Sequence, residues 1–147
     1  MFDRKKFIND SLKESSEIKM KVLESCYDDI MKASDIVLDV IRNGNKMMLC
    51  GNGGSAADSQ HLATEFMIRL SHDIQRKAIP AIALSTDSSN LTAGGNDIGF
   101  ENIFARNIEG IGKEGDVLIG ISTSGNSKNI IKAVQTAKSM GIKTICL

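Results

Sequence analysis

Residues 116–134 read DVLIGISTSGNSKNIIKAV and predict a strand, a small polar loop and a helix in direct succession. Val117–Ile121 is a short apolar run of the β type, whereas Ile130–Val134 has apolar residues at helical spacing. The loop Ser122–Ser127 between them has no bulky side chain. Because the first turn of a helix offers unpaired N–H groups and partial positive charge, a hydroxyl loop before it can hold a phosphate. The alternative, with Ser127 only a helix cap and the other hydroxyls a surface turn, stays open.

A second unit of the same kind precedes this one. Lys46–Cys50 predicts a buried strand, Gly51–Ser55 a glycine loop and Ala56–Leu70 a helix. Glycine allows positive φ and lets a ligand approach the backbone. Further strands are expected at Ala78–Leu84, with Pro80 favouring an edge position, and at Ile142–Leu147.

The remaining segments are predicted to be helical or turns. Residues 2–43 contain no proline and predict two helices with a break near Ser25–Asp28. A short helix is expected at Asn90–Ala93, a sharp turn at Gly94–Asp97 and another helix at Phe100–Ile111. Alternating strands and helices predict an α/β fold, a three-layer sandwich with a parallel sheet, preceded by an N-terminal helical pair. Both glycine and hydroxyl loops then lie at the carboxyl edge of the sheet, where ligands bind in such folds.

Composition narrows the class of protein. The chain has 147 residues, 41% hydrophobic and 24% charged, which indicates one globular domain with a real core. A net charge of zero argues against a nucleic-acid partner. Three cysteines without CxxC spacing indicate a reducing compartment, and no apolar run reaches the roughly 20 residues that span a bilayer. We therefore expect a cytoplasmic protein with no membrane partner.

Asp58, His61 and Glu65 recur at offsets of three and four and therefore share one face of the predicted helix. A carboxylate and an imidazole one turn apart can act as a general base and its orienting group, or as two metal ligands. The alternative is a surface pair that contributes a few tenths of a kcal/mol. We expect Glu65 and Ser124 to open onto one cavity, within a chain or across a subunit boundary.

Three segments together resemble one known family. CGNGGSAADSQHLATEF, GGNDIGFENIF and GDVLIGISTSGNSKNIIKA resemble the sugar isomerase (SIS) domain, and within that group the phosphoheptose isomerases. The resemblance implies the flavodoxin-like, nucleotide-binding topology of SIS domains. It implies an SIS domain at residues 44–147, apparently truncated at its C-terminus, and oligomerisation helices at residues 1–43.

The resemblance also implies roles for individual residues. The phosphate ligands are Ser122, Thr123, Ser124 and Ser127, with Ser55 nearby, and the sugar contacts are Asn52, Gly53, Gly54, Asn96 and Asp97. Glu65 is the catalytic base, contacts the substrate and, together with His61, binds zinc where the family binds it. A glutamine and a histidine that complete the family's site would lie beyond Leu147. Family members are homotetramers with active sites between subunits.

The implied activity is isomerisation of D-sedoheptulose 7-phosphate to D-glycero-D-manno-heptose 7-phosphate through an enediol. This is the first step of nucleotide-activated heptose synthesis for lipopolysaccharide or capsule. The alternative is a non-catalytic SIS module that binds the bacterial replication initiator or senses a sugar phosphate. Retention of both His61 and Glu65 favours the enzyme.

Overall fold

The computed structural model describes residues 2–147 and divides after Asp35 into two compact units. Met1, the first residue of the predicted N-terminal segment, lies outside the described residues. Helix α1 spans Arg4–Ser25, and its N-terminus is capped by Asp3, whose side chain accepts a hydrogen bond from the Lys6 N–H (3.0 Å). Helix α2 spans Tyr27–Arg42, so the break falls where the sequence predicts it.

The second unit is built on a four-stranded parallel sheet in the order β2-β1-β3-β4. The strands are β1 (Met47–Gly51), β2 (Ala81–Ala83), β3 (Val117–Ile121) and β4 (Lys143–Cys146). The register pairs Met47 with Val117 and Gly51 with Ile121, so β1 and β3 end at the same edge. These two central strands are buried at every residue, as expected for apolar strands covered on both faces.

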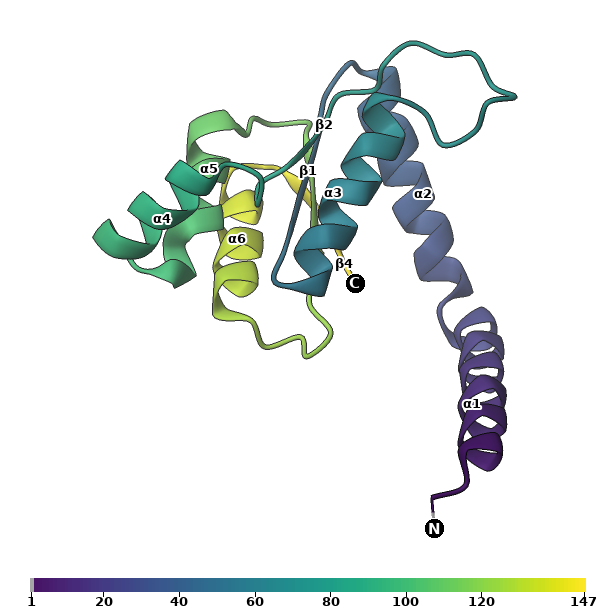
Figure 1. Cartoon of the computed structure of the whole chain (residues 1–147). Coiled ribbons are helices and arrows are strands. Elements are labelled where there is room, and N and C mark those ends of the chain that lie inside the picture. Colours follow the sequence, from purple (N-terminus) through teal and green to yellow (C-terminus); the bar gives the residue numbers. More distant parts are fainter. Residues whose placement is uncertain (1) are drawn as a thin grey trace. The chain divides into compact units, whose positions relative to one another are not determined.

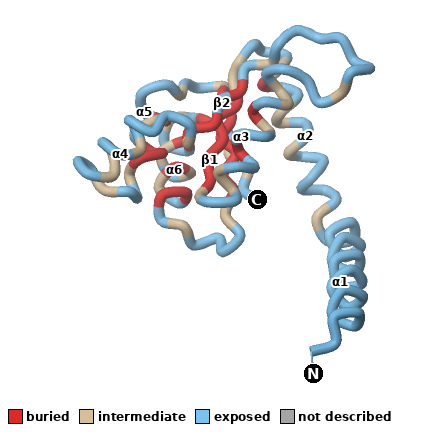
Figure 2. The backbone as a smooth tube through the Cα atoms, viewed as in Figure 1, coloured by how far each residue is buried: buried red, intermediate tan, exposed pale blue. Residues whose placement is uncertain are grey.

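Two hydrophobic clusters, one on each face of the sheet, make the sandwich three-layered (Figure 1). On one face Met48 and Leu118 pack with helices α5 (Ile103–Ile111) and α6 (Lys128–Ser139). On the other face Met47 and Leu49 pack with helix α3 (Gly54–Met67) and with residues 36–42 of α2, which contribute Val40. Buried residues are concentrated on β1, β2 and β3, whereas no residue of β4 is buried; Figure 2 shows this burial around the labelled strands β1 and β2.

Several predicted boundaries differ from the structure; helix α3, for instance, runs from Gly54 to Met67 and not from Ala56 to Leu70. Strand β2 is shorter than the predicted Ala78–Leu84 because Pro80 has no N–H to donate to a ladder; its carbonyl still accepts from Met47 N (2.9 Å). As predicted, this strand lies at the edge of the sheet.

The predicted sharp turn at Gly94–Asp97 is wrong, because helix α4 runs from Ser88 through Asp97. Its glycines serve packing: a Cβ at Gly94 would lie 3.2 Å from Ile103 Cγ1. The chain turns instead at Gly99, whose φ is +85°, before the short 3-10 helix η1 (Phe100–Asn102) and α5.

Asp116 joins the amino ends of the two central strands. Its carboxylate is fully buried and accepts hydrogen bonds from Lys46 N (3.0 Å), Lys113 N (3.0 Å) and the Lys46 ammonium. Because Lys46 and Lys113 lie on different segments, this one carboxylate fixes the entry of both β1 and β3 into the sheet. Between residues 2 and 147, no helix is long and apolar enough to cross a membrane.

Candidate functional site

The glycine loop after β1 lies against the first turn of α3. A Cβ at Gly51 would fall 2.5 Å from the carbonyl carbon of Ser55 and still closer to its oxygen, so only glycine allows this approach. Gly53 has φ +53°, and its carbonyl accepts from Ala56 N (3.1 Å) and Ala57 N (3.2 Å). The predicted Gly53 and Gly54 are exposed at the carboxyl edge of the sheet, where a ligand can reach the backbone.

The hydroxyl loop after β3 leads into α6. Ser127 occupies the N-cap position, but its side chain makes no capping bond; its hydroxyl pairs with that of Ser122 (3.1 Å). Ser124 Oγ accepts from Asn126 N (3.2 Å), and both Thr123 and Ser124 are exposed. The interpretation of Ser127 as a simple cap therefore lacks the hydrogen bond it requires, and the loop presents hydroxyls in front of a helix N-terminus.

A reciprocal amide pair joins the two loops. Asn52 Nδ2 donates to Asn129 Oδ1 (2.9 Å), and Asn129 Nδ2 donates to Asn52 Oδ1 (2.8 Å). Asn52 belongs to the predicted set, whereas Asn129 does not. The signal for Asn129 was its place on the inward stripe of α6 with Ala133 and Ala137, which marks a buried polar group that needs a partner.

Asn96 and Asp97 lie at the end of α4, where Asn96 Nδ2 donates to Asp97 Oδ1 (2.7 Å). Both side chains are exposed. No hydrogen bond among the described residues joins either of them to the glycine loop or the hydroxyl loop, so their predicted contact with a sugar stays a prediction.

Glu65 and His61 lie in the second half of α3, away from the loop at which this helix begins. Glu65 follows Gly54 by eleven residues, which is roughly 16 Å along a helix axis. The two side chains line a cavity of about 380 Å³ with Phe66 and Arg69, and His61 Nε2 lies 3.7 Å from Glu65 Oε1. Glu65 Oε2 is buried and has no hydrogen-bond partner within residues 2–147.

Arg76, which the sequence does not single out, closes the carboxyl end of α3. Its guanidinium donates to the carbonyls of Glu65 (2.5 Å), Phe66 (2.7 Å) and Lys77 (3.0 Å). A cation at this end of a helix also opposes the negative end of the helix dipole. Arg76 therefore fixes the turn of α3 from which the Glu65 side chain projects.

One copy of the chain does not bring the two halves of the predicted site together. Ser122 lines a separate cavity of about 190 Å³ between α6 and β4, and Glu65 does not line it. The expectation that Glu65 and Ser124 share a cavity is therefore not met within a single chain, because α3 carries Glu65 away from the carboxyl edge.

The predicted zinc ligands do not form a metal site by themselves. His61 and Glu65 supply two donors, and residues 2–147 contain no group of three His, Cys, Asp or Glu side chains able to hold a metal ion. A tetrahedral zinc site needs four ligands, or three and a water molecule. The described residues therefore supply two of the ligands that zinc needs and do not complete a zinc site.

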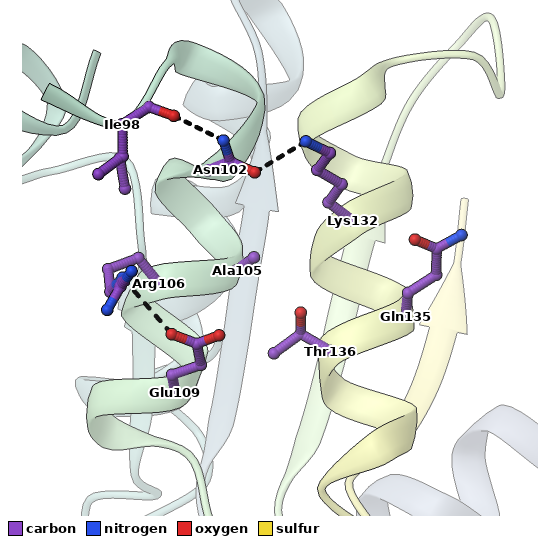
Figure 3. A pocket seen from close by; sticks show the side chains of 8 residues that line it. All are labelled: Ile98, Asn102, Ala105, Arg106, Glu109, Lys132, Gln135 and Thr136. Carbon is purple, nitrogen blue, oxygen red and sulfur yellow. Dashed lines mark hydrogen bonds and ion pairs between the residues drawn. The ribbon is translucent and has the colours of Figure 1, made fainter. Parts of the chain in front are cut away.

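A further groove, of about 370 Å³, lies between α5 and α6 and contains none of the predicted site residues (Figure 3). Lys132 Nζ donates to Asn102 Oδ1 (2.8 Å) and lies 3.6 Å from Glu101 Oε1. The pKa of Glu101 lies below its usual value, because its own backbone N–H and then Lys132 stabilise the carboxylate. The Lys132 side chain therefore contacts Asn102 and Glu101 in this groove and does not contact the hydroxyl loop.

The fold and the two loops at one sheet edge define the class of protein. A sequence model described as the SIS domain matches residues 12–147. This match includes both loops, α3 with its Glu65, and every strand of the sheet.

Curated relatives narrow the class further. A phosphoheptose isomerase of Chlorobaculum parvum is 52% identical over 133 residues, which are 90% of this chain and 64% of the relative. One of Clostridium acetobutylicum is 52% identical over 143 residues, or 96% of this chain and 72% of the relative. This protein belongs to the phosphoheptose isomerase family of SIS-domain proteins. The chain spans just under two thirds of the length of the Chlorobaculum relatives.

Solved structures of the same family have the same fold. A phosphoheptose isomerase from Francisella tularensis superposes with a TM-score of 0.92 at 34% identity, covering 99% of this chain and 75% of that one. The enzyme from Neisseria gonorrhoeae gives a TM-score of 0.88 at 37% identity, covering 98% and 74%. The predicted α/β class with a parallel sheet is confirmed.

Proposed function

We propose that this protein isomerises D-sedoheptulose 7-phosphate to D-glycero-D-manno-heptose 7-phosphate. In the open-chain ketose a base removes a proton from C1 and returns it to C2, while a second proton moves between the oxygens on C2 and C1. The carbonyl thereby moves from C2 to C1 through an enediol, and no atoms are gained or lost. Such a reaction needs a positioned carboxylate base and a remote handle that orients the reacting carbons.

The state of Glu65 is the observation that carries the proposal. Its Oε2 is buried in a largely apolar cavity without a hydrogen-bond partner among residues 2–147. A buried carboxylate oxygen without a partner lowers the stability of the fold, because it loses the hydrogen bonds it would make to water. A helix with a purely structural role gains nothing from such a group. A carboxylate held ready for a substrate proton accounts for this cost.

The hydroxyl loop supplies the handle. Ser122, Thr123, Ser124 and Ser127 offer small donors in front of the N-terminus of α6, a setting suited to the three oxygens of a phosphate. The glycine loop that follows the neighbouring strand β1 lies beside it, and its residues Asn52, Gly53, Gly54 and Ser55 suit the sugar hydroxyls. Binding energy from the phosphate can then orient the carbons that react.

The proposed active site is shared between copies of the chain, in a homotetramer. The separation of the Glu65 cavity from the hydroxyl loop within one chain supports a site that needs a second copy. The exposed apolar side chains of α1, among them Leu12 (68% exposed) and Ile18 (52%), suit burial against another copy. A cytoplasmic setting and a place at the start of heptose synthesis for a surface polysaccharide belong to the same proposal.

Zinc takes no part in the steps proposed here, because His61 and Glu65 would need further ligands from outside the described part of this chain. If such ligands were supplied, a zinc ion at this pair could polarise the substrate carbonyl. In this proposal His61 is the group that orients Glu65, since its Nε2 lies 3.7 Å from Glu65 Oε1.

The test is turnover of sedoheptulose 7-phosphate by the wild-type protein and by Glu65→Gln, with Glu109→Gln as control. Glu109 is an exposed carboxylate of the α5/α6 groove and lies outside the proposed site. We expect Glu65→Gln to lower kcat by about 10²–10⁴-fold and Glu109→Gln to leave it unchanged. Equal turnover by wild type and Glu65→Gln would rule out Glu65 as the base. Absent turnover in a wild-type protein that binds the bacterial replication initiator would favour a non-catalytic SIS module.

A further inference from the structure

Asn129 is the only asparagine among the three buried polar or charged residues of the described chain, with 3% of its surface exposed. It lies in the first turn of α6, directly behind the hydroxyl loop. None of the sequence motifs assigns it a role. A buried amide is retained where its hydrogen bonds are satisfied, so its partners indicate its purpose.

All of its described hydrogen bonds stay at the carboxyl edge of the sheet. Asn129 Oδ1 accepts from Asn52 Nδ2 (2.9 Å) and from Ile130 N (3.0 Å), and Asn129 Nδ2 donates to Asn52 Oδ1 (2.8 Å). The two asparagines are 77 positions apart in sequence and come from different βα units. No other side-chain hydrogen bond among residues 2–147 joins the glycine loop to α6.

The reciprocal pairing fixes the orientation of the Asn52 amide. A primary amide has two N–H donors and an oxygen that accepts twice. Asn129 uses one donor and one acceptor position of Asn52. One N–H and one lone pair remain on Asn52, and they point in directions that the pairing determines. An amide that rotated freely could not present donor and acceptor in a fixed order.

We propose that Asn129 is a positioning residue: it orients Asn52 toward the sugar and sets the spacing between the sugar loop and the phosphate loop. This inference rests on the proposed isomerase function, in which Asn52 contacts the sugar. Asn129 itself touches no substrate in the proposal and acts only through Asn52. A displacement of about 1 Å in a group that orients a substrate can cost on the order of 100-fold in rate.

The first experiment is a double-mutant cycle on kcat/KM with Asn52→Ala, Asn129→Ala and the double variant. Asn129→Ala should lower kcat/KM by about 10–100-fold in the wild-type background. In the Asn52→Ala background it should change kcat/KM by less than about twofold, because no amide remains to be oriented. A merely structural role would lower kcat/KM by the same factor in both backgrounds and would overturn the proposal.

Ala133→Gly is the matched control. Ala133 is fully buried one turn further along α6, and glycine there weakens the same helix without removing an amide. We expect Ala133→Gly to lower the melting temperature and leave kcat/KM within about twofold of wild type. If Asn129→Ala has no larger effect on kcat/KM than Ala133→Gly, the proposal is wrong.

A second measurement does not depend on activity. Hydrogen exchange of the backbone amides of residues 55–57, which donate to the carbonyls of Asn52 and Gly53, should accelerate equally in Asn52→Ala and Asn129→Ala, and should not accelerate in Ala133→Gly. Unchanged exchange in Asn129→Ala would overturn the coupling between the loops. Faster exchange in a protein that turns over no heptose phosphate would retain the coupling and reject the proposed function, so the two failures are distinguishable.

Discussion

Replacing Gly51 by alanine should separate the β1 loop from α3. The added Cβ would lie 2.5 Å from the Ser55 carbonyl carbon and 2.7 Å from Ser55 Cβ, where ordinary contacts begin at 3.4 Å. These neighbours belong to the first turn of α3, so the helix start must move by roughly 1 Å, because close-packed interiors have no free space to absorb the methyl group. Overpacking of this kind costs about 1–3 kcal/mol, and we expect the upper end because backbone atoms must move.

Urea unfolding followed by circular dichroism measures this cost, since the protein has no tryptophan for fluorescence. Gly54→Ala is the matched control: its Cβ would meet no heavy atom within 4 Å, and its φ is not positive. It should leave stability unchanged or raise it by about 0.5–1 kcal/mol, because alanine restricts the unfolded chain. Coincident unfolding curves for wild type and Gly51→Ala would refute the argument from close approach, as would equal destabilisation by both substitutions.

Three further predictions concern stability and reactivity. In the same unfolding assay, Asp116→Ala should lower the free energy of unfolding by about 3 kcal/mol, because two backbone N–H groups and the Lys46 ammonium lose their buried acceptor. A loss below about 1 kcal/mol would contradict this prediction. Arg76→Ala should cost about 1 kcal/mol and speed hydrogen exchange at the end of α3, since the last carbonyls lose their donor; unchanged exchange there would show that the guanidinium is not a cap. Burial, and to a lesser extent the neighbouring Cys146, raises the pKa of Cys50 from 9.0 to about 12. Iodoacetamide at pH 8 should therefore label the exposed Cys146 and should not label Cys50 until urea unfolds the protein. Because the folded pKa is the higher one, the stability that protonated Cys50 contributes is complete below pH 9 and is lost between about pH 9 and 12.

The order of strands and helices was predictable because apolar runs and glycine turns alternate clearly along the chain. Met47–Gly51 and Val117–Ile121 are buried on both faces and therefore appear as unbroken apolar segments. Helix α4 was not predictable in the same way, since Gly94 in a sequence pattern usually marks a turn. Its actual purpose, a close approach to Ile103, depends on a helix that the chain reaches only later.

The residues of the candidate site were predictable as types, but their grouping was not. Hydroxyls before a helix and a carboxylate beside an imidazole are formed by residues close together in the chain, so they can be recognised from the sequence alone. The partner of Asn129 is 77 positions away, and nothing local to either asparagine specifies the other. The position of Glu65, about three turns from the glycine loop, follows from helix geometry once the helix start is known.

The order of the sheet has a consequence for synthesis on the ribosome. Strand β1 pairs on one side with β2 and on the other with β3, which begins 70 positions after it, at Val117. Until that later segment leaves the exit tunnel, Met47–Gly51 keeps one unpaired edge and part of its apolar surface without cover. The nascent chain therefore carries an aggregation-prone strand during much of its translation, and slowing the ribosome before residue 117 should increase its dependence on chaperones.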